Sequence, residues 1–573
     1  MAPDGTGADR PTTHTTRRDF LRWSGGIAAS AGLLGGGGAL LDACGGGGGQ
    51  GQSGNAGQPK KGGHVTEGWF SDIKTFNSTL SSDVYSSLCI GLCFDGLLNV
   101  DAKGNLIPGL AQSVPSVGSD QNTYEFKLRP NLKWSDGQPL TSDDVLFTYN
   151  LFFAPQYEVV NSPRRGDFTA HVASISAPDP QTFVIKTKHP YGPTLPTHGL
   201  YGVLPKHVLG SIPPAGINTA DFNTAPTVCS GVFKFVKWVK GAQITFERNP
   251  TYWGGQSRLD GFVYKVVSST VQVANQLKTG EIDVGQIDAS QLSAIQATHG
   301  ITVDGFATPS FSFYMYQLDP TKPAGQIFQD VNVRQALLYA TDRAGIVKTA
   351  VFGQGEVANS VEPPTSWAWN KNTKPTYPHD PDKANKMLES AGWVKGPDGI
   401  RAKGGKRLAF TIQGIAGSTP ATNTMQIMQQ NWKQVGVELT PKSVQFDQIV
   451  TAITDTRDFD LILVGFNFGS DPDESQLFSS AGTRPGGFNG FDFKNAEADR
   501  LQTQAAASID RATRKQLYFQ YQNLMAQLVP APVLYFQKFN WGLAQRVQGY
   551  GLGPFNQYGN RPWMKDVWVT DSK

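Results

Sequence analysis

Short segments in which apolar and polar residues alternate, or in which apolar residues run together, recur along most of the chain. The segments 64–69, 124–128, 408–412, 437–440 and 461–464 have this pattern, which is typical of strands. Between them lie longer segments in which apolar residues recur at the helical spacing. This alternation of strands and helices predicts an α/β fold class with mostly parallel sheets.

Several predicted helices begin at a capping signal. Thr141 has Asp144 three residues later, so the two residues can satisfy the first free amides of a helix reciprocally. Asp380 precedes Pro381, which suits an N-cap followed by proline at the first helical position. Asp510 opens a long helix, and a further helix is predicted over 84–92. The apolar residues of the long helix fall on one face: Leu517, Tyr521, Leu524, Met525 and Leu528.

Length and composition bound the possible functions. A chain of 573 residues is too long for one hydrophobic core, so two or three packed units are expected. The 50 basic and 47 acidic residues give a net charge of +3 without a basic stripe, which argues against a nucleic-acid partner. The body of the chain contains no apolar run long enough to span a membrane.

The N-terminal region has the pattern of an export signal. Arg17 and Arg18 are followed by Phe20-Leu21, a mildly apolar stretch over 25–41, and then Leu41-Asp42-Ala43-Cys44. This pattern predicts a twin-arginine lipoprotein signal peptide over 1–43, with Cys44 as the lipid attachment site. Asp42 is an uncommon residue in a lipoprotein cleavage box, so cleavage without lipidation stays open.

A Gly-rich segment follows the predicted anchor. Residues 44–59 carry too few apolar side chains to form a core and are expected to act as a flexible tether. The protein is therefore expected outside the cytoplasm, lipid-anchored to the outer face of the bacterial cytoplasmic membrane. Whether the envelope has one membrane or two, and so whether the site is periplasm or cell surface, stays open.

The remaining reactive residues show no catalytic or metal-binding pattern. Cys89, Cys93 and Cys229 allow at most one internal disulfide and leave one thiol over; Cys89 and Cys93 are expected to be small buried residues. The eight histidines have no paired metal spacing, so neither a metal nor a cofactor is predicted. No nucleophile elbow or zinc-protease motif is present, but catalytic groups can lie far apart in a sequence, so a surface hydrolase stays the remote alternative to our expectation of no enzyme.

Motifs in a fixed order carry a resemblance to a known family. Pro108-Gly109-Leu110-Ala111 is followed by 123–129, and Trp134-Ser135-Asp136-Gly137 stands within 133–141, before Asp143-Asp144-Val145. Further segments follow in order: 231–235, 247–250, 252–254, 277–283, 333–337, 342–343, 380–384 and 391–393. In these segments the chain resembles the extracellular solute-binding proteins of peptide- and nickel-type ABC importers.

The resemblance implies a two-lobed fold like that of type II periplasmic binding proteins, with an extra domain inserted in lobe one. Hinges are expected where the chain crosses between lobes, near 306–310 and 529–534. Carried over to this chain, lobe one comprises 60–100, 189–308 and 533–573, the inserted domain 101–188, and lobe two 309–532.

The implied function is that of a monomeric substrate-binding lipoprotein, which captures an extracellular solute by hinge closure and delivers it to an ABC permease. Arg334, Asp342 and Arg343 belong to the family motifs. They are expected to form structural ion pairs and caps rather than ligand contacts.

The identity of the solute depends on one position. In peptide carriers of this type, an acidic residue three positions before an Asp-Pro pair binds the peptide's ammonium group. Here the pair is Asp471-Pro472, and the aligned residue is Phe468. A peptide is expected by family frequency. An oligosaccharide or another neutral solute is the alternative, because an aromatic ring suits a sugar face better than an ammonium group.

Candidate ligand contacts are the aromatic residues in the expected ligand-facing loops, with two polar neighbours. Asn467 could supply hydrogen bonds, and Asp471 could take the ammonium group if the alignment slips. The predicted set is Trp69, Phe70, Trp367, Trp369, Phe466, Asn467, Phe468, Asp471 and Trp541.

Overall fold

The computed structural model describes residues 58–267, 269–483, 487–557 and 559–571. The predicted signal peptide, Cys44 and residues 44–57 of the predicted tether lie outside these ranges.

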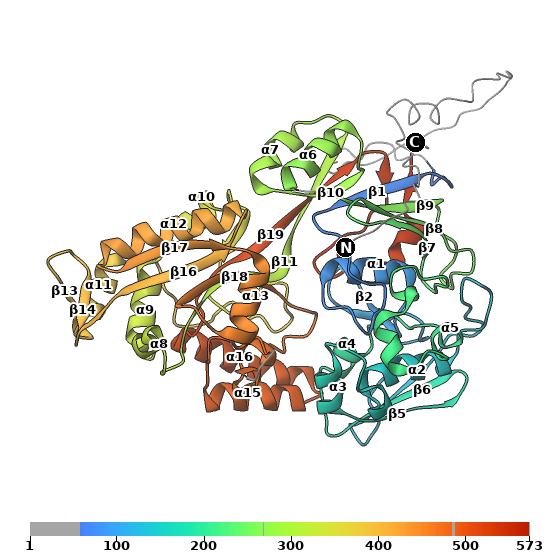
Figure 1. Ribbon diagram of the computed structural model, residues 1–573, viewed down its shortest axis with the longest axis horizontal. Coiled ribbons are helices and arrows are strands. Elements are labelled where there is room, and N and C mark those ends of the chain that lie inside the picture. The colour runs from blue at the N-terminus through green and yellow to red at the C-terminus, as the bar shows by residue number, and fades with distance from the viewer. Residues whose placement is uncertain (1–57, 268, 484–486, 558, 572–573) are drawn as a thin grey trace, which may run out of the picture. The chain divides into compact units, whose positions relative to one another are not determined.

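One large sheet runs through the described residues. Its eleven strands follow the order β17-β16-β18-β11-β19-β10-β1-β9-β8-β7, with β12 paired to β19 (Figure 1). The bounds are β1 His64–Trp69, β7 Phe233–Val239, β8 Gln243–Arg248, β9 Gly261–Val266, β10 Val284–Ile287, β11 Ile301–Tyr316, β12 Gly355–Val357, β16 Ala409–Ile415, β17 Glu438–Val444, β18 Leu461–Asn467 and β19 Val533–Ala544.

The sheet is mixed, so the prediction of mostly parallel sheets is wrong. Strand β1 is parallel to β9 and β10, and β16 is parallel to β17 and β18. The other pairs are antiparallel, including β11 with β18 and β19 and the hairpins β7-β8 and β8-β9. Whether two strands run parallel or antiparallel depends on which distant segments pair. The local alternation of strands and helices carries no information about this pairing.

Two large hydrophobic cores lie toward opposite ends of the long strands β11 and β19. One is built from residues between Phe311 and Phe536, and the other from residues between Val65 and Tyr264 together with Val284 and the C-terminal residues 541–569. Strands β11 and β19 pair along most of their length and contribute to both: Phe306 and Phe539 pack against the second core, Phe311 and Phe536 belong to the first. These strands therefore join the two halves of the fold.

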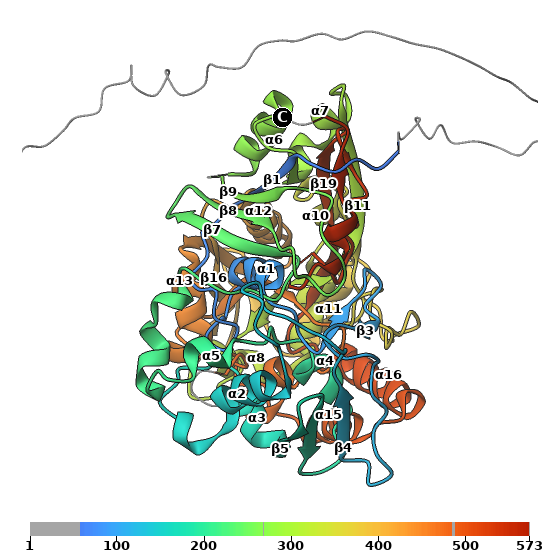
Figure 2. The same cartoon turned by 90° about the vertical axis from the view of Figure 1, so that its right-hand side faces the viewer.

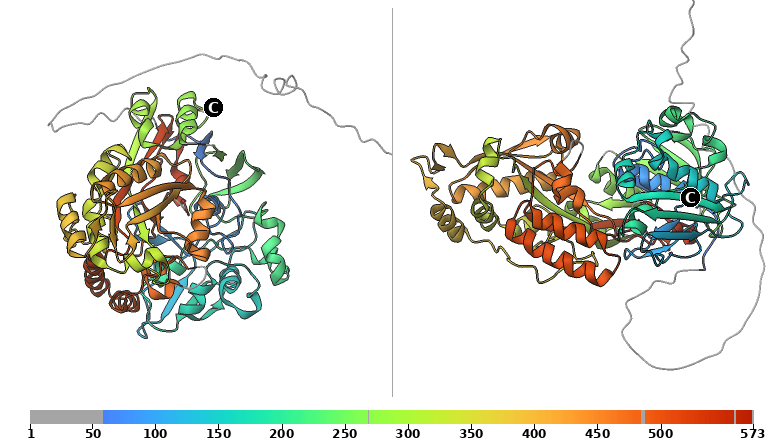
Figure 3. Two further views of the ribbon diagram at one scale, coloured as in Figure 1. Left: turned by 60° about the vertical axis from the view of Figure 1, so that its left-hand side comes forward. Right: turned by 90° about the horizontal axis from the view of Figure 1, so that it is seen from below.

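Helices pack on the large sheet and on one another. Helix α12 (Thr419–Gln434) packs on β16 and β17, and α6 (Thr270–Thr279) packs on β10. Helices α15 (Ala496–Ala507) and α16 (Arg511–Leu528) pack side by side, as the orange-red pair in Figure 3 shows. Further helices are α1 Val84–Cys93, α8 Pro323–Phe328, α9 Val331–Ala340, α10 Arg343–Thr349, α11 Pro381–Ser390, α13 Phe446–Thr451 and α14 Ser475–Phe478.

A separate three-stranded sheet lies within the range predicted for the inserted domain. Its order is β4 (Thr123–Lys127), β6 (Thr182–Thr187), β5 (Val172–Asp179). Helix α2 (Ser142–Phe153) packs on β5 and β6, and α3 (Arg165–His171) lies beside it (Figure 2). None of the described helices combines the length and apolar content needed to cross a membrane.

The predicted helix starts are confirmed. The Thr141 side chain and the Asp144 carboxylate form a reciprocal capping box on α2. Asp380 accepts the Lys383 amide at the start of α11, and Asp510 accepts the Thr513 amide at the start of α16. These signals could be found in the sequence because each involves residues within one helical turn.

Candidate functional site

The last residues of β18 form a sheet edge with a free side. Strand β18 pairs with β11 from Leu461 to Asn467, but with β16 only at Leu461 and Ile462. Beyond Ile462, no other described strand pairs with the edge of β18 that faces away from β11. Both Gly465 and Asn467 are exposed.

The direction of the backbone groups follows from one hydrogen bond. The amide of Phe468 donates to the Pro309 carbonyl over 2.7 Å, on the β11 side. Because successive residues of a strand point their backbone groups to opposite edges, the N–H and C=O groups of Gly465 and Asn467 point to the free edge. This edge can therefore accept a further extended strand.

Aromatic rings line the same strand end. Phe466 and Phe468 are half-buried, with ring centroids 5.7 Å apart. Phe468 packs against Phe311 at 4.9 Å, and Phe466 packs edge-on against Phe488 at 5.5 Å. Phe488 is 36% exposed, so part of this apolar wall is accessible to a ligand.

A polar network lies beside Gly465, on the crossing strands. Ser310 Oγ donates to Gln537 Oε1 over 3.0 Å and is 2.5 Å from Thr308 Oγ1. A Cβ atom at position 465 would lie 3.3 Å from Gln537 Nε2, so a side chain at this position would crowd the Gln537 amide that reaches across β11. The ring wall and this network together fix the position of the β18 end.

Asp471 is held in a buried ion pair. One of its carboxylate oxygens lies 2.6 Å from Nη2 of Arg514 on α16, and both side chains are nearly buried. The carboxylate already has its counter-charge, so the structure does not support Asp471 as a free partner for a ligand ammonium group. The sequence could not show this, because Arg514 is 43 residues further along the chain.

Two further carboxyl groups are buried next to Asp471. Glu362 and Glu474 are 2% and 3% exposed. Within the described residues, neither oxygen of Glu474 nor Oε1 of Glu362 has a hydrogen-bond partner. Burial, and then the nearby charges of Asp471 and Asp473, raise the pKa of Glu362 to about 8, although a hydrogen bond from Ser366 opposes the shift. Burial and the charge of Glu362 also raise the pKa of Glu474.

The raised pKa of Glu362 predicts that stability falls as the pH rises. The native protein keeps a proton that the unfolded chain releases above its ordinary pKa of 4.5, so stability is lost between about pH 4.5 and pH 8. We expect the midpoint of thermal unfolding to be about 3 °C lower at pH 8 than at pH 5. Scanning calorimetry should show that the unfolding midpoint falls less steeply with pH in Glu362→Gln than in the unchanged protein. In exposed Glu356→Gln the midpoint should fall as steeply as in the unchanged protein. Equal slopes in all three proteins would contradict this assignment.

Two predicted contact residues lie in the core. Trp69 is 2% exposed and Trp541 is fully buried. Their rings pack together with centroids 5.2 Å apart, and Trp69 also stacks on Tyr264 at 6.2 Å. In this structure neither ring is accessible to a solute, so both predictions are corrected: the rings of these tryptophans, on β1 and β19, pack on each other across β10.

The other predicted aromatics are half-buried but take separate positions. Phe70 packs against the small cluster that contains Val273 and Leu277 of α6. The Arg511 guanidinium lies 4.6 Å from the centroid of the Trp367 ring, and this ring packs edge-on against Tyr518. The amide of Trp369 donates to the Ser366 carbonyl. Of the predicted residues, the structure thus gathers Phe466, Asn467 and Phe468 on one strand end, with Asp471 shortly beyond.

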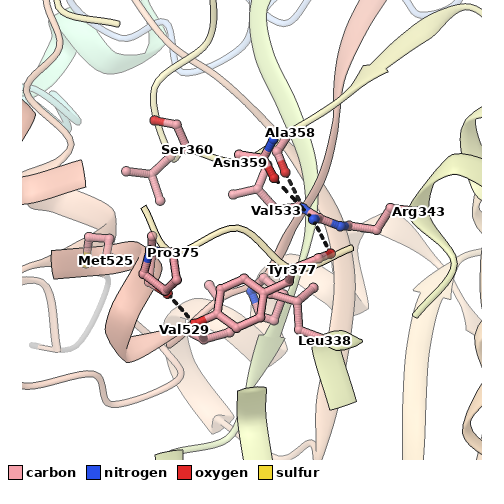
Figure 4. A pocket seen from close by; sticks show the side chains of 14 residues that line it. Leu338, Arg343, Ala358, Asn359, Ser360, Pro375, Tyr377, Met525, Val529 and Val533 are labelled. Carbon is pink, nitrogen blue, oxygen red and sulfur yellow. Dashed lines mark hydrogen bonds between the residues drawn. The ribbon is translucent and has the colours of Figure 1, made fainter. Parts of the chain in front are cut away.

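Two motif arginines hold the second strand crossing. Arg343 donates to the carbonyls of Ala358, Val533 and Tyr377, in the wall of a small cavity of about 40 Å³ (Figure 4). Arg334 donates to the carbonyls of Leu528 and Val529. The expected ion pairs are therefore wrong for both arginines, since their partners are backbone carbonyls and, for Arg343, also the side-chain oxygen of Asn359. The expected cap is confirmed, because Asp342 caps α10.

Sequence reasoning missed Glu362, Gln537 and Phe488. Glu362 stands alone between apolar Val361 and Pro363, and a single acid in such a stretch is the signal that could have drawn attention to it. Gln537 and Phe488 carry no such signal. The described residues contain no group of histidine, cysteine and acidic side chains arranged to hold a metal ion.

Comparisons with known proteins agree on one family. Residues 105–488 match the family described as bacterial extracellular solute-binding proteins, family 5 middle. The oligopeptide-binding protein AppA of Bacillus subtilis is 29% identical over 505 residues, which cover 87% of this chain and 91% of the relative. The oligopeptide-binding protein OppA of Lactococcus lactis is 28% identical over 516 residues, 84% of each chain.

Solved structures show the same fold. AppA of Bacillus subtilis in complex with a nonapeptide has a TM-score of 0.77 at 28% identity, covering 90% of this chain and all of that chain. NikZ of Campylobacter jejuni in complex with Ni(L-His) has a TM-score of 0.76 at 26% identity, covering 88% of this chain and 99% of that chain. The two-lobed, type II α/β fold that the resemblance implies is thereby confirmed.

These relatives are binding proteins rather than enzymes, and their family is extracytoplasmic. The chain belongs to the bacterial extracellular solute-binding proteins of family 5, and it is the substrate-binding protein of an ABC importer.

Proposed function

We propose that the protein captures peptides in an extended conformation along the free edge of β18 and delivers them to its membrane permease. The observation that carries this proposal is the orientation of Gly465 and Asn467, whose backbone groups face an edge with no strand partner in the described part of the chain. A peptide pairing there is recognised mainly through its main chain, which suits a carrier of many sequences. The nonapeptide in AppA supports this assignment.

The ligand's N-terminus is expected to bind without an ion pair at position 468. Phe468 offers a half-buried ring, and Asp471 is neutralised by Arg514. Apolar ligand side chains can instead pack against Phe466 and Phe488. Acetylation of a peptide's N-terminus should therefore change its affinity by less than about threefold.

We propose that ligand capture closes the two lobes on each other by bending at β11 and β19. The lobes have the residue ranges that the resemblance implies. A contact far from these strands supports this. The Gly192 amide, just before α4 (Thr194–His198), donates to the Ala506 carbonyl at the end of α15 over 2.7 Å. Residue 192 falls in the proposed lobe one and Ala506 in the proposed lobe two.

Gly192→Ala should weaken ligand affinity by about tenfold. A Cβ atom at this position would lie 2.4 Å from the Ser508 carbonyl oxygen and 3.0 Å from the Arg514 guanidinium. The clash raises the free energy of the closed state, and about 1.4 kcal/mol corresponds to tenfold. Titration calorimetry tests this against Gly551→Ala, whose Cβ would meet its neighbours at 3.7 Å or more. Unchanged affinity would show that this contact does not form on closure.

The membrane attachment is proposed from the N-terminal sequence. The twin arginines with the Cys44 box support export and lipid anchoring, and a lipid on Cys44 would keep the carrier next to its permease. Mass spectrometry of the exported protein tests this: an acylated N-terminal Cys44 is expected, and an unmodified N-terminus would contradict it.

A neutral oligosaccharide is the second candidate ligand. Phe466 and Phe468 could stack on sugar rings, and exposed Asn467 could donate hydrogen bonds. This candidate requires that the free edge of β18 stays unpaired in the complex, which distinguishes it from peptide capture.

Calorimetric titration of refolded, ligand-free protein separates the candidates. The panel comprises extended peptides of up to nine residues, each free and N-acetylated, together with cello-, xylo- and chito-oligosaccharides and a nickel–histidine complex. Micromolar or tighter binding of peptides, nearly independent of acetylation, is expected. Binding of a sugar alone would overturn peptide capture. Binding abolished by acetylation would show that a carboxylate takes the ammonium group.

A further inference from the structure

Two of the three cysteines in the described body are packed against each other. Cys93 ends α1, and Cys229 lies just before β7; the two side chains are 0% and 1% exposed. Burial, and then the neighbouring Cys229 thiol, raise the pKa of the Cys93 thiol, so the two side chains are neighbours. Both are reduced in this structure.

The backbones of the two residues are also in contact. The amides of Ser230 and Gly231, directly after Cys229, donate to the Cys93 carbonyl over 2.8 and 2.7 Å. A Cβ atom at Gly231 would lie 2.4 Å from the Leu92 carbonyl oxygen, so a glycine is what lets the segment approach the helix end. Hydrogen-bonded backbones and neighbouring thiols make these two residues the candidate pair for a disulfide, which requires a close approach of the two residues.

Cys89 lies on the same helix but in other surroundings. It stands one helical turn before Cys93, and the charged groups around it are Glu67, Arg561, Asp72 and Asp83. Among the described cysteines, Cys93 and Cys229 are the pair joined through hydrogen-bonded backbones, which leaves Cys89 as the odd thiol.

We propose that Cys93 and Cys229 form a disulfide in the exported protein, while Cys89 stays a free thiol. The family is extracytoplasmic, and such compartments allow disulfides to form and persist. The bond would tie α1 to the segment that leads into β7, closing a long loop within the second hydrophobic core.

The oxidant is a disulfide, either small or carried by a thiol oxidoreductase. One thiolate of the pair attacks a sulfur of this disulfide and expels one thiolate, which takes up a proton. The second thiolate of the pair then attacks the cysteine sulfur of this mixed disulfide. The Cys93–Cys229 bond forms, and the oxidant's second sulfur leaves as a thiolate and is protonated. The pair loses two protons and two electrons, and the oxidant gains them. Burial raises the pKa of the Cys93 thiol, so exchange in the folded protein should be slow.

Alkylation mapping of the full-length exported protein tests the proposal. The protein is denatured without reductant, treated with iodoacetamide and digested with trypsin. One tryptic peptide, 75–103, carries both Cys89 and Cys93, and 207–234 carries Cys229. The expected product joins these two peptides and carries one alkylated cysteine, which fragmentation places at Cys89.

Matched variants assign the bond. Cys89→Ser should keep the cross-linked peptide, and Cys93→Ser and Cys229→Ser should lose it. If the protein as isolated is reduced, it is incubated with oxidised glutathione in mild denaturant before mapping. Three alkylated cysteines after this incubation, or a bond that includes Cys89, would overturn the proposal. Because mapping of the unmodified chain suffices, the test does not depend on any variant folding.

Discussion

Replacing Asn467 with proline should lower peptide affinity by about 10- to 100-fold, because it removes the amide that faces the free edge of β18. Proline is tolerated at an edge strand when its missing N–H would have pointed away from the sheet. The pairing of β18 with β11 runs through the backbone groups of Phe466 and Phe468, so it should survive. Titration calorimetry with the best peptide of the panel measures the effect.

The matched control is Asn467→Ala, which keeps the amide and removes the side chain. Peptide capture through the backbone predicts an affinity within about threefold of the unchanged protein for this variant. If alanine costs as much as proline, the side chain binds the ligand, as an oligosaccharide site would require. If proline costs nothing, the free edge is not the binding surface.

Replacing Arg561 with methionine should lower the free energy of unfolding by about 3–5 kcal/mol, because it leaves the Glu67 carboxylate buried without a counter-charge. Both side chains are fully buried, and Nη1 of Arg561 lies 2.7 Å from Oε2 of Glu67. Arg561 also donates to the Gln557 carbonyl over 2.6 Å. The pair joins β1 to the C-terminal segment within the second core, and chemical unfolding measures the loss.

Two variants control for the general effect of losing an arginine. Arg500→Met breaks an ion pair with Glu497 in which both side chains are about half exposed, so little or no loss of stability is expected. Glu67→Gln combined with Arg561→Met removes both charges and should recover part of the loss. A loss below about 1 kcal/mol for Arg561→Met alone would contradict a stabilising role for this buried ion pair.

Local features of the fold could be predicted from the sequence. The caps at Thr141, Asp380 and Asp510 involve residues within one turn, and the structure has each of them. The strand predicted over 461–464 exists and extends to Asn467. Family motifs then supplied the two-lobed architecture, which no local pattern contains.

The candidate site could be predicted only in part, because burial and ion pairing depend on distant partners. Trp69 and Trp541 follow the same pattern as ligand-facing aromatics, but their rings pack on each other from opposite ends of the chain. The sequence leaves Asp471 free to bind a ligand ammonium group, but in the structure its carboxylate is paired with Arg514 on α16. The position of Phe468 next to Asp471-Pro472 is a local property of the sequence, and its role toward the ligand stays a prediction.

A crystal structure of the peptide complex tests the central claim most directly. The account predicts a peptide in extended conformation whose backbone makes hydrogen bonds of about 2.7–3.2 Å to the N–H and C=O groups of Gly465 and Asn467. A ligand that leaves these groups unpaired, or that lies away from the end of β18, would contradict it.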